Sequence, residues 1–398
     1  MNARPTITTS VILGLGQILT WGGSFFLMAV LAAPVVSDTG WPRQWVYGSL
    51  SLGMLVAGLL SPWVGRKIGR EGGRRLLAGS GLLIAAGLVL LALAPVLAVF
   101  VMGWLVIGAG MAIGLYDPLF ATLGALYGEG ARRSISQVTL VSGFCTTLVW
   151  PLMGWLIASF GWREACLCYA ALLALTVWPL HMRTLPDASP VFRAASSDAQ
   201  PDIGTEPPAK LFWLVTAGFI VSSVVMTAVS VHLIALLQAS GFTLAAAVGL
   251  GSLIGPAQVG ARLVDAAATK LHPFWSALGF TLLVAAGLLL LLLAPAVASV
   301  AIVLYGAGSG IRSIVRGTLP LALFGRQHYA AVLGRIAQPV LIAQAATPLL
   351  GGYLLEHAGA NASLRVLAAL ALLNIGLVLA LLPWRRHGDR RVAEAVES

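Results

Sequence analysis

Charged side chains are scarce in this sequence. Only 10% of the 398 residues are Asp, Glu, Lys or Arg, whereas 59% are hydrophobic; soluble domains carry about 25% charged residues. The apolar residues form long uninterrupted runs, which excludes a soluble class and also a transmembrane β-barrel, whose strands are short and alternating. The composition therefore predicts an all-α polytopic membrane protein in contact with the lipid bilayer.

Cysteine is also rare, and catalytic patterns are missing. The three cysteines, Cys145, Cys166 and Cys168, lie in apolar runs without the spacing of a metal site or a disulfide framework. We find no P-loop, Ser-His-Asp arrangement or paired catalytic carboxylates, so we expect no cofactor, no metal and no enzymatic activity. The net charge of +10 is attributed to basic loops on one membrane face and not to binding of nucleic acid.

Twelve apolar segments are long enough to cross a bilayer as helices. Their predicted bounds are Ser10–Val36, Trp45–Val64, Leu76–Ala94, Leu97–Leu126, Ile135–Phe160, Ala165–His181, Leu211–Leu237, Leu244–Val264, Phe274–Ala294, Val297–Leu323, Ala330–Leu355 and Leu364–Pro383. A polar gap separates the sixth from the seventh. We predict an N-terminal six-helix half at 1–182, a linker at 183–210, a C-terminal six-helix half at 211–384 and a tail at 385–398.

Lys and Arg predict the orientation of these spans. One set of loops and span ends is rich in them, from Arg66 to Arg75, at Arg132 and Arg133, and again in the linker and the tail. The other set holds only Arg43, Arg163 and Arg365. By the positive-inside rule, both termini and the linker face the cytoplasm. We expect a monomer in the plasma or inner membrane.

Two spans carry charged residues deep within apolar sequence. A shared Gly-Ala-Gly-x-x-Ile pattern aligns Gly108–Ile113 in the first half with Gly306–Ile311 in the second. Asp117 follows the first pattern; Arg312 and Arg316 follow the second and, four residues apart, share one helical face. Intramembrane charges are costly and usually functional, and parallel repeats place a site near the midplane. A central polar site is therefore predicted.

The chemistry of these three residues leaves alternatives open. Arginine binds carboxylate or phosphate through its planar fork, which favours an anion-binding pair; alternatively, both side chains extend to the membrane interface. Asp117 is the candidate for proton coupling and a candidate substrate contact. The alternative is that Asp117 neutralises Arg316 and holds the halves together, because buried charges are usually paired.

Further candidates for the lining of the substrate site are Tyr116, His232, Gln17 and Gln258. Each also has a structural interpretation. Tyr116 can pack with its hydroxyl bonded, and His232 can be a hydrogen-bonded structural histidine.

Small residues and proline predict packing features. Gly110-x-x-x-Gly114 and Gly306-x-x-x-Gly310 allow close helix approach in lipid. Pro118 and Pro320 are expected to kink their spans.

The basic loop after the second span carries a motif. It contains Gly65, Arg70, Gly72, Arg74 and Arg75 and resembles the loop between spans 2 and 3 of the major facilitator superfamily, Gly-x-x-x-Asp-Arg-x-Gly-x-Arg-Arg. Gly69 stands where the family has Asp. The resemblance implies two six-helix halves, and it implies that the loop takes part in a charged latch, here without its carboxylate.

Together these features predict a secondary active transporter that works by alternating access. We expect the substrate to be a small organic anion whose transport is coupled to protons. One alternative is proton-coupled efflux of amphipathic drugs or metabolites. The other is a non-transporting membrane receptor on the same fold.

Overall fold

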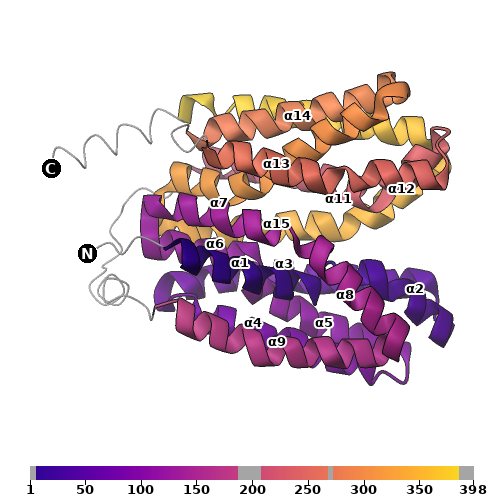
Figure 1. The fold of residues 1–398 in the computed structure, drawn as a ribbon. Helices are drawn as coiled ribbons and strands as arrows, with labels where there is room; N and C mark the ends of the chain where they lie inside the picture. The colour runs from indigo at the N-terminus through magenta and orange to yellow at the C-terminus, as the bar shows by residue number, and fades with distance from the viewer. Residues whose placement is uncertain (1–5, 187–207, 268–271, 385–398) are drawn as a thin grey trace. The chain divides into compact units, whose positions relative to one another are not determined.

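The computed structural model describes residues 6–186, 208–267 and 272–384 (Figure 1). The chain forms two compact units. The first contains Met1–Asp202 and Arg326–Ala345, and the second contains Ile203–Gly325 and Ala346–Ser398. Most of the predicted linker and the whole predicted tail lie outside the described residues.

The first unit is built from apolar helices that follow one another with short connections. These are α1 (Ile7–Gly22), α2 (Met28–Thr39), α3 (Arg43–Glu71), α4 (Arg74–Ala92), α5 (Leu97–Gly114), α6 (Tyr116–Tyr127), the 3₁₀ turn η1 (Gly128–Gly130), α7 (Ala131–Ser142), α8 (Cys145–Phe160) and α9 (Trp162–Thr184). Helix α4 packs against α5 and α9, α3 packs against α5, and α1 packs against α7 and α9.

The second unit follows the same plan with fewer separate helices. They are α11 (Ala209–Ala239), α12 (Leu244–Ser252), α13 (Ile254–Ala267), α14 (Pro273–Leu293), the 3₁₀ turn η2 (Pro295–Val297) and α15 (Ala298–Leu379). Helix α15 has non-helical dihedral angles at Gly325 and Gly359, so it comprises three consecutive helices. Its residues Arg326–Ala345 belong to the first unit.

The predicted all-α membrane fold is confirmed. Among the described residues, 10 helices are long and apolar enough to cross a membrane. The two remaining predicted spans are interrupted: Ser10–Val36 divides into α1 and α2, and Leu244–Val264 divides into α12 and α13. Pro118 lies in the first turn of α6, directly after a break, as expected. At Pro320 the backbone of α15 stays helical.

Helix ends repeat between the halves of the sequence. Gly128 and Gly325 both have positive φ, as do Gly161 and Gly359. The last two are nearly identical, with φ of 94° and 81° and ψ of 165° and 175°. Glycine reaches these angles without the steric cost that a Cβ brings. Glycines with similar backbone angles therefore occur at corresponding positions of the two halves, which supports the predicted repeat.

The Gly-Ala-Gly pattern of the first half packs two helices against α5. A Cβ at Gly108 would overlap the backbone of Gly53 in α3, and one at Gly110 would lie 2.6 Å from the Ile84 side chain in α4. Gly114 lies against Ser80, also in α4. Close backbone approach of this kind is what small residues allow in lipid.

The matching pattern in the second half has the same role. Gly306 lies against Ile254 of α13, and Gly310 lies against the backbone of Gln258 in the same helix. Gly308 instead faces Phe280 of α14. The packing interpretation of both small-residue motifs is therefore confirmed.

A third close approach joins α3 to the Arg326–Ala345 part of α15, within the first unit. A Cβ at Gly65 would lie 2.5 Å from the Ala330 carbonyl oxygen, and one at Gly334 would lie 2.5 Å from the Ser61 carbonyl oxygen. Gly65 of the loop motif is thus required for helix packing.

We predict that Gly108→Ala destabilises the fold by about 1–3 kcal/mol, because the new methyl group meets backbone that cannot rotate away. The measurement is the thermal unfolding midpoint of the purified protein in detergent. Gly79→Ala is the matched control, since a Cβ at Gly79 in α4 meets nothing within 4 Å. Equal midpoints for the two variants would contradict the packing described here.

Candidate functional site

Interruptions of three spans meet in the first unit. The first lies between α1 and α2, the second at Leu115 between α5 and α6, and the third between α7 and α8. Leu115 has extended dihedral angles, φ −80° and ψ −164°. Interrupted helices within a membrane expose backbone polar groups, which are tolerated only inside protein or beside a water-filled cavity. Such breaks commonly mark the binding site of a transporter.

Gln17 donates a hydrogen bond to a backbone carbonyl group at one of these breaks. Its Nε2 donates to the Gly114 carbonyl oxygen at 2.8 Å, and its Oε1 accepts from Trp21 Nε1 at 3.1 Å. The last carbonyl groups of a helix have no partner within that helix. Gln17 is fully buried, so it stabilises the end of α5 and orients Trp21. As a substrate contact, Gln17 stays a prediction.

Asp117 and Tyr116 begin α6 immediately after the break. Asp117 lies in the first turn of this helix. The Tyr116 hydroxyl is 2.6 Å from Ser142 Oγ on α7. This hydrogen bond agrees with the structural interpretation, in which the tyrosine ring is packed and its hydroxyl is bonded. Both side chains are partly exposed.

Aromatic rings surround the breaks. The aromatic cluster consists of Trp21, Phe25, Phe26, Tyr116, Phe120 and Trp150. Trp21 lies 4.9 Å from Tyr116, 5.6 Å from Phe25 and 5.6 Å from Phe26 between ring centroids. Tyr116 stacks on Phe120 at 5.1 Å, and Phe26 meets Trp150 at 6.5 Å. Of these six residues, the sequence indicated only Tyr116 as a candidate site residue. The others are aromatic residues within apolar runs, and by sequence they look the same as ordinary core residues.

Arg312 is held by α11 in the second unit. Its Nε donates to Ser222 Oγ at 3.0 Å, and its Nη2 donates to Ser223 Oγ. Both serines are buried. The guanidinium thus reaches across to a neighbouring helix rather than along its own helix, which favours the binding-site interpretation over extension to the interface. Part of Arg312 stays exposed.

Arg316 follows one turn later on α15 and is also partly exposed. It belongs to the second unit, whereas Asp117 belongs to the first. Their predicted proximity therefore stays a prediction.

A buried arginine on α13 was missed by the sequence analysis. Arg262 is only 6% exposed; its Nε donates to the Gly310 carbonyl oxygen at 3.2 Å and its Nη2 to Ser313 Oγ at 3.0 Å. Gln258, one turn earlier, donates from Nε2 to Ser309 Oγ at 2.9 Å. Arg262 lies near the end of the predicted span Leu244–Val264, and the apolar residues on both sides of it are a signal of burial.

His232 has a structural partner. Its Nε2 is 3.2 Å from the Pro348 carbonyl oxygen, and its ring lies against Gly351. The geometry favours the interpretation of a hydrogen-bonded structural histidine.

A buried carboxylate lies in the second unit. Asp265, at the end of α13, is 9% exposed and accepts a hydrogen bond from Ser276 Oγ at 2.5 Å. It lies just beyond the predicted span Leu244–Val264, so the sequence did not indicate its burial.

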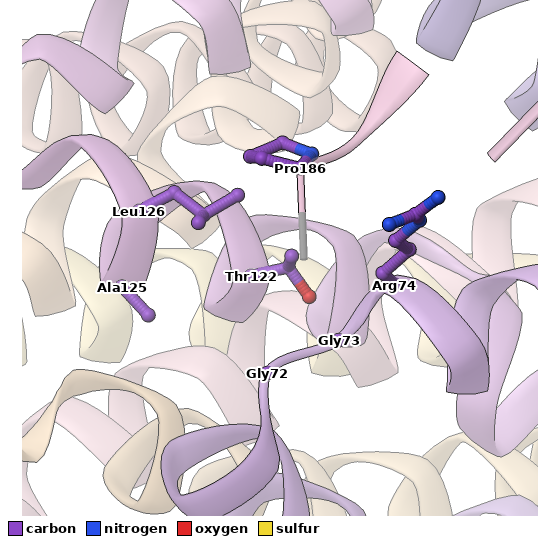
Figure 2. Close-up of a pocket in the computed structure, with 7 residues that line it drawn as sticks. All are labelled: Gly72, Gly73, Arg74, Thr122, Ala125, Leu126 and Pro186. Atoms are coloured by element: carbon purple, nitrogen blue, oxygen red, sulfur yellow. The ribbon is translucent and has the colours of Figure 1, made fainter. Parts of the chain in front are cut away.

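The loop motif has a structural basis. Gly72 ends α3 with φ 80°, and Arg74 begins α4 and donates from Nη2 to the Met182 carbonyl oxygen of α9. Figure 2 shows a small pocket lined in part by this loop, with Thr122 of α6 beside Gly73. Gly69 and Arg70 are exposed. Arg74 therefore joins the ends of α4 and α9, in addition to any role in a latch.

Comparison with known proteins identifies the class. The model of the Major Facilitator Superfamily matches residues 13–337. The chain belongs to this superfamily and is a multi-pass membrane transporter, not an enzyme. No curated protein matches the chain in sequence.

Solved structures share the fold at low sequence identity. The human organic anion transporter MFSD10 (TETRAN) is 16% identical with a TM-score of 0.70, over 94% of this chain and 98% of that one. The transporter FucP in its outward conformation is 12% identical with a TM-score of 0.73, over 93% and 97%. The proton:xylose symporter XylE bound to 6-bromo-6-deoxy-D-glucose is 13% identical with a TM-score of 0.70, over 95% of both chains.

Proposed function

We propose that this transporter moves a small organic anion by alternating access. The observation that carries the proposal is Arg312, whose guanidinium is fixed by Ser222 and Ser223 and yet is partly exposed. A guanidinium held in place loses little freedom when it binds a planar anion. Arg316, one turn away on the same helix face, adds a second positive charge for a carboxylate.

We further propose that protons drive the transport and that Asp117 carries them. Support comes from its position in the first turn of α6, beside a helix break and partly exposed. A carboxylate is a side chain that can take up and release a proton during a transport cycle. The proton:xylose symporter with the same fold is described by its name as proton-coupled.

Efflux of amphipathic compounds is the second candidate. The aromatic cluster favours it, because ring faces bind apolar groups with little regard for charge. In either case the proposed location is the plasma or inner membrane, with a monomeric chain and both termini in the cytoplasm.

Arg312→Leu should weaken the binding of small carboxylates by about 3–5 kcal/mol, because a charge in a poorly solvated site loses its partner. Arg312→Lys should recover only part of this loss, since lysine lacks the planar fork. The measurement is the affinity of the purified protein for carboxylates in detergent. Arg66→Lys, an exposed position on α3, is the control. Unchanged affinity in both Arg312 variants would refute the organic-anion proposal and favour apolar efflux.

Asp117→Asn should abolish accumulation driven by a proton gradient while leaving exchange down a substrate gradient, because the amide binds no proton at physiological pH. Uptake into proteoliposomes with and without an imposed pH gradient measures both activities. Glu71→Gln is the control, since Glu71 is exposed and pairs only with Lys67 at the surface in the described contacts. Undiminished accumulation in Asp117→Asn would remove Asp117 from the coupling role.

A further inference from the structure

The break between α1 and α2 is packed tightly on one side. A Cβ at Gly22 would overlap the hydroxyl of Tyr169, and one at Gly23 would lie 2.7 Å from Leu173. Tyr169 also donates from its hydroxyl to the Leu19 carbonyl oxygen at 3.1 Å. Helix α9 therefore fixes the backbone of the break. Because Gly22 and Gly23 have no side chains, most of the side-chain volume at this break belongs to the neighbouring aromatic residues.

The polar groups of these aromatic residues are already bonded within the first unit. Trp21 Nε1 donates to Gln17, and Trp150 Nε1 donates to the Phe26 carbonyl oxygen at 3.0 Å. The Tyr116 hydroxyl is bonded to Ser142. What these residues offer to a ligand is therefore the faces and edges of their rings.

The burial of the cluster differs from that of a hydrophobic core. Phe120 is fully buried, whereas Trp21, Phe25, Phe26 and Tyr116 are all partly exposed. Trp21 meets Phe25 at 78° and Tyr116 at 50°, so the exposed rings present both faces and edges. Rings inclined in this way suit a further aromatic ring, which gains edge-to-face contacts beyond simple burial. Rigid aromatic side chains also lose little entropy on binding.

We propose that the aromatic cluster binds a planar aromatic ring, so that the transported compound is an aromatic carboxylate rather than an aliphatic one. This inference rests on the proposed function.

The test compares benzoate with cyclohexanecarboxylate, which share charge and ring size but differ in planarity and in their π system. Affinity is measured on the full-length purified protein by competition and by the shift in thermal unfolding. The wild-type protein should prefer benzoate by roughly two- to twelvefold, the range of aromatic pair interactions converted to affinity. Trp21→Leu should lose this preference while retaining cyclohexanecarboxylate binding, and Trp21→Phe should keep part of it.

The control is Trp155→Leu, because Trp155 is 60% exposed, lies on α8 and contacts Phe160 rather than the cluster. Equal affinity for the two acids in the wild-type protein, or equal effects of Trp21→Leu and Trp155→Leu, would overturn the inference while leaving the anion proposal intact. If neither acid binds, or if benzylammonium binds better than benzoate and Arg312→Lys has no effect, the proposed function and this inference both fail.

Discussion

The main constraint on this structure is that a bilayer offers no water to a backbone polar group. A break in a transmembrane helix can persist only if side chains replace the lost hydrogen bonds. In the first unit, Gln17 donates to the carbonyl of Gly114, and Tyr169 donates to that of Leu19. These bonds permit α5 and α1 to end within the apolar region. The breaks in turn place Asp117, Tyr116 and the aromatic cluster together.

The same constraint applies in the second unit, where arginine and glutamine side chains make the hydrogen bonds between helices. Three helices are joined by polar side chains: Arg312 binds serines of α11, while Arg262 and Gln258 of α13 bind groups on α15. Each guanidinium is stabilised by hydrogen bonds to neutral oxygen atoms. The two repeats share a backbone plan and differ in the chemistry of these side chains.

The sequence predicted the helices and the repeat, because apolar length, small residues and basic loops report directly on the bilayer. It also predicted that the motifs Gly110-x-x-x-Gly114 and Gly306-x-x-x-Gly310 serve packing. It did not predict that the first and eighth spans are broken, since both breaks lie inside continuous apolar sequence. Arg262 and the aromatic cluster were missed for a related reason: burial and ring contacts depend on which helix faces which, and hydropathy carries no such information. His232 was a candidate for binding by residue type, and only the contact with Pro348 showed a structural partner.

Counterflow in proteoliposomes tests the central claim, that the arginine site of the second unit makes this chain an organic-anion transporter. Vesicles containing the wild-type protein are loaded with unlabelled benzoate and diluted into radiolabelled benzoate. We predict a transient accumulation of label in wild-type vesicles and its absence in Arg312→Leu vesicles, where the protein is folded but lacks the guanidinium. Equal accumulation in the two preparations, or none in the wild type with any organic carboxylate, would contradict the account.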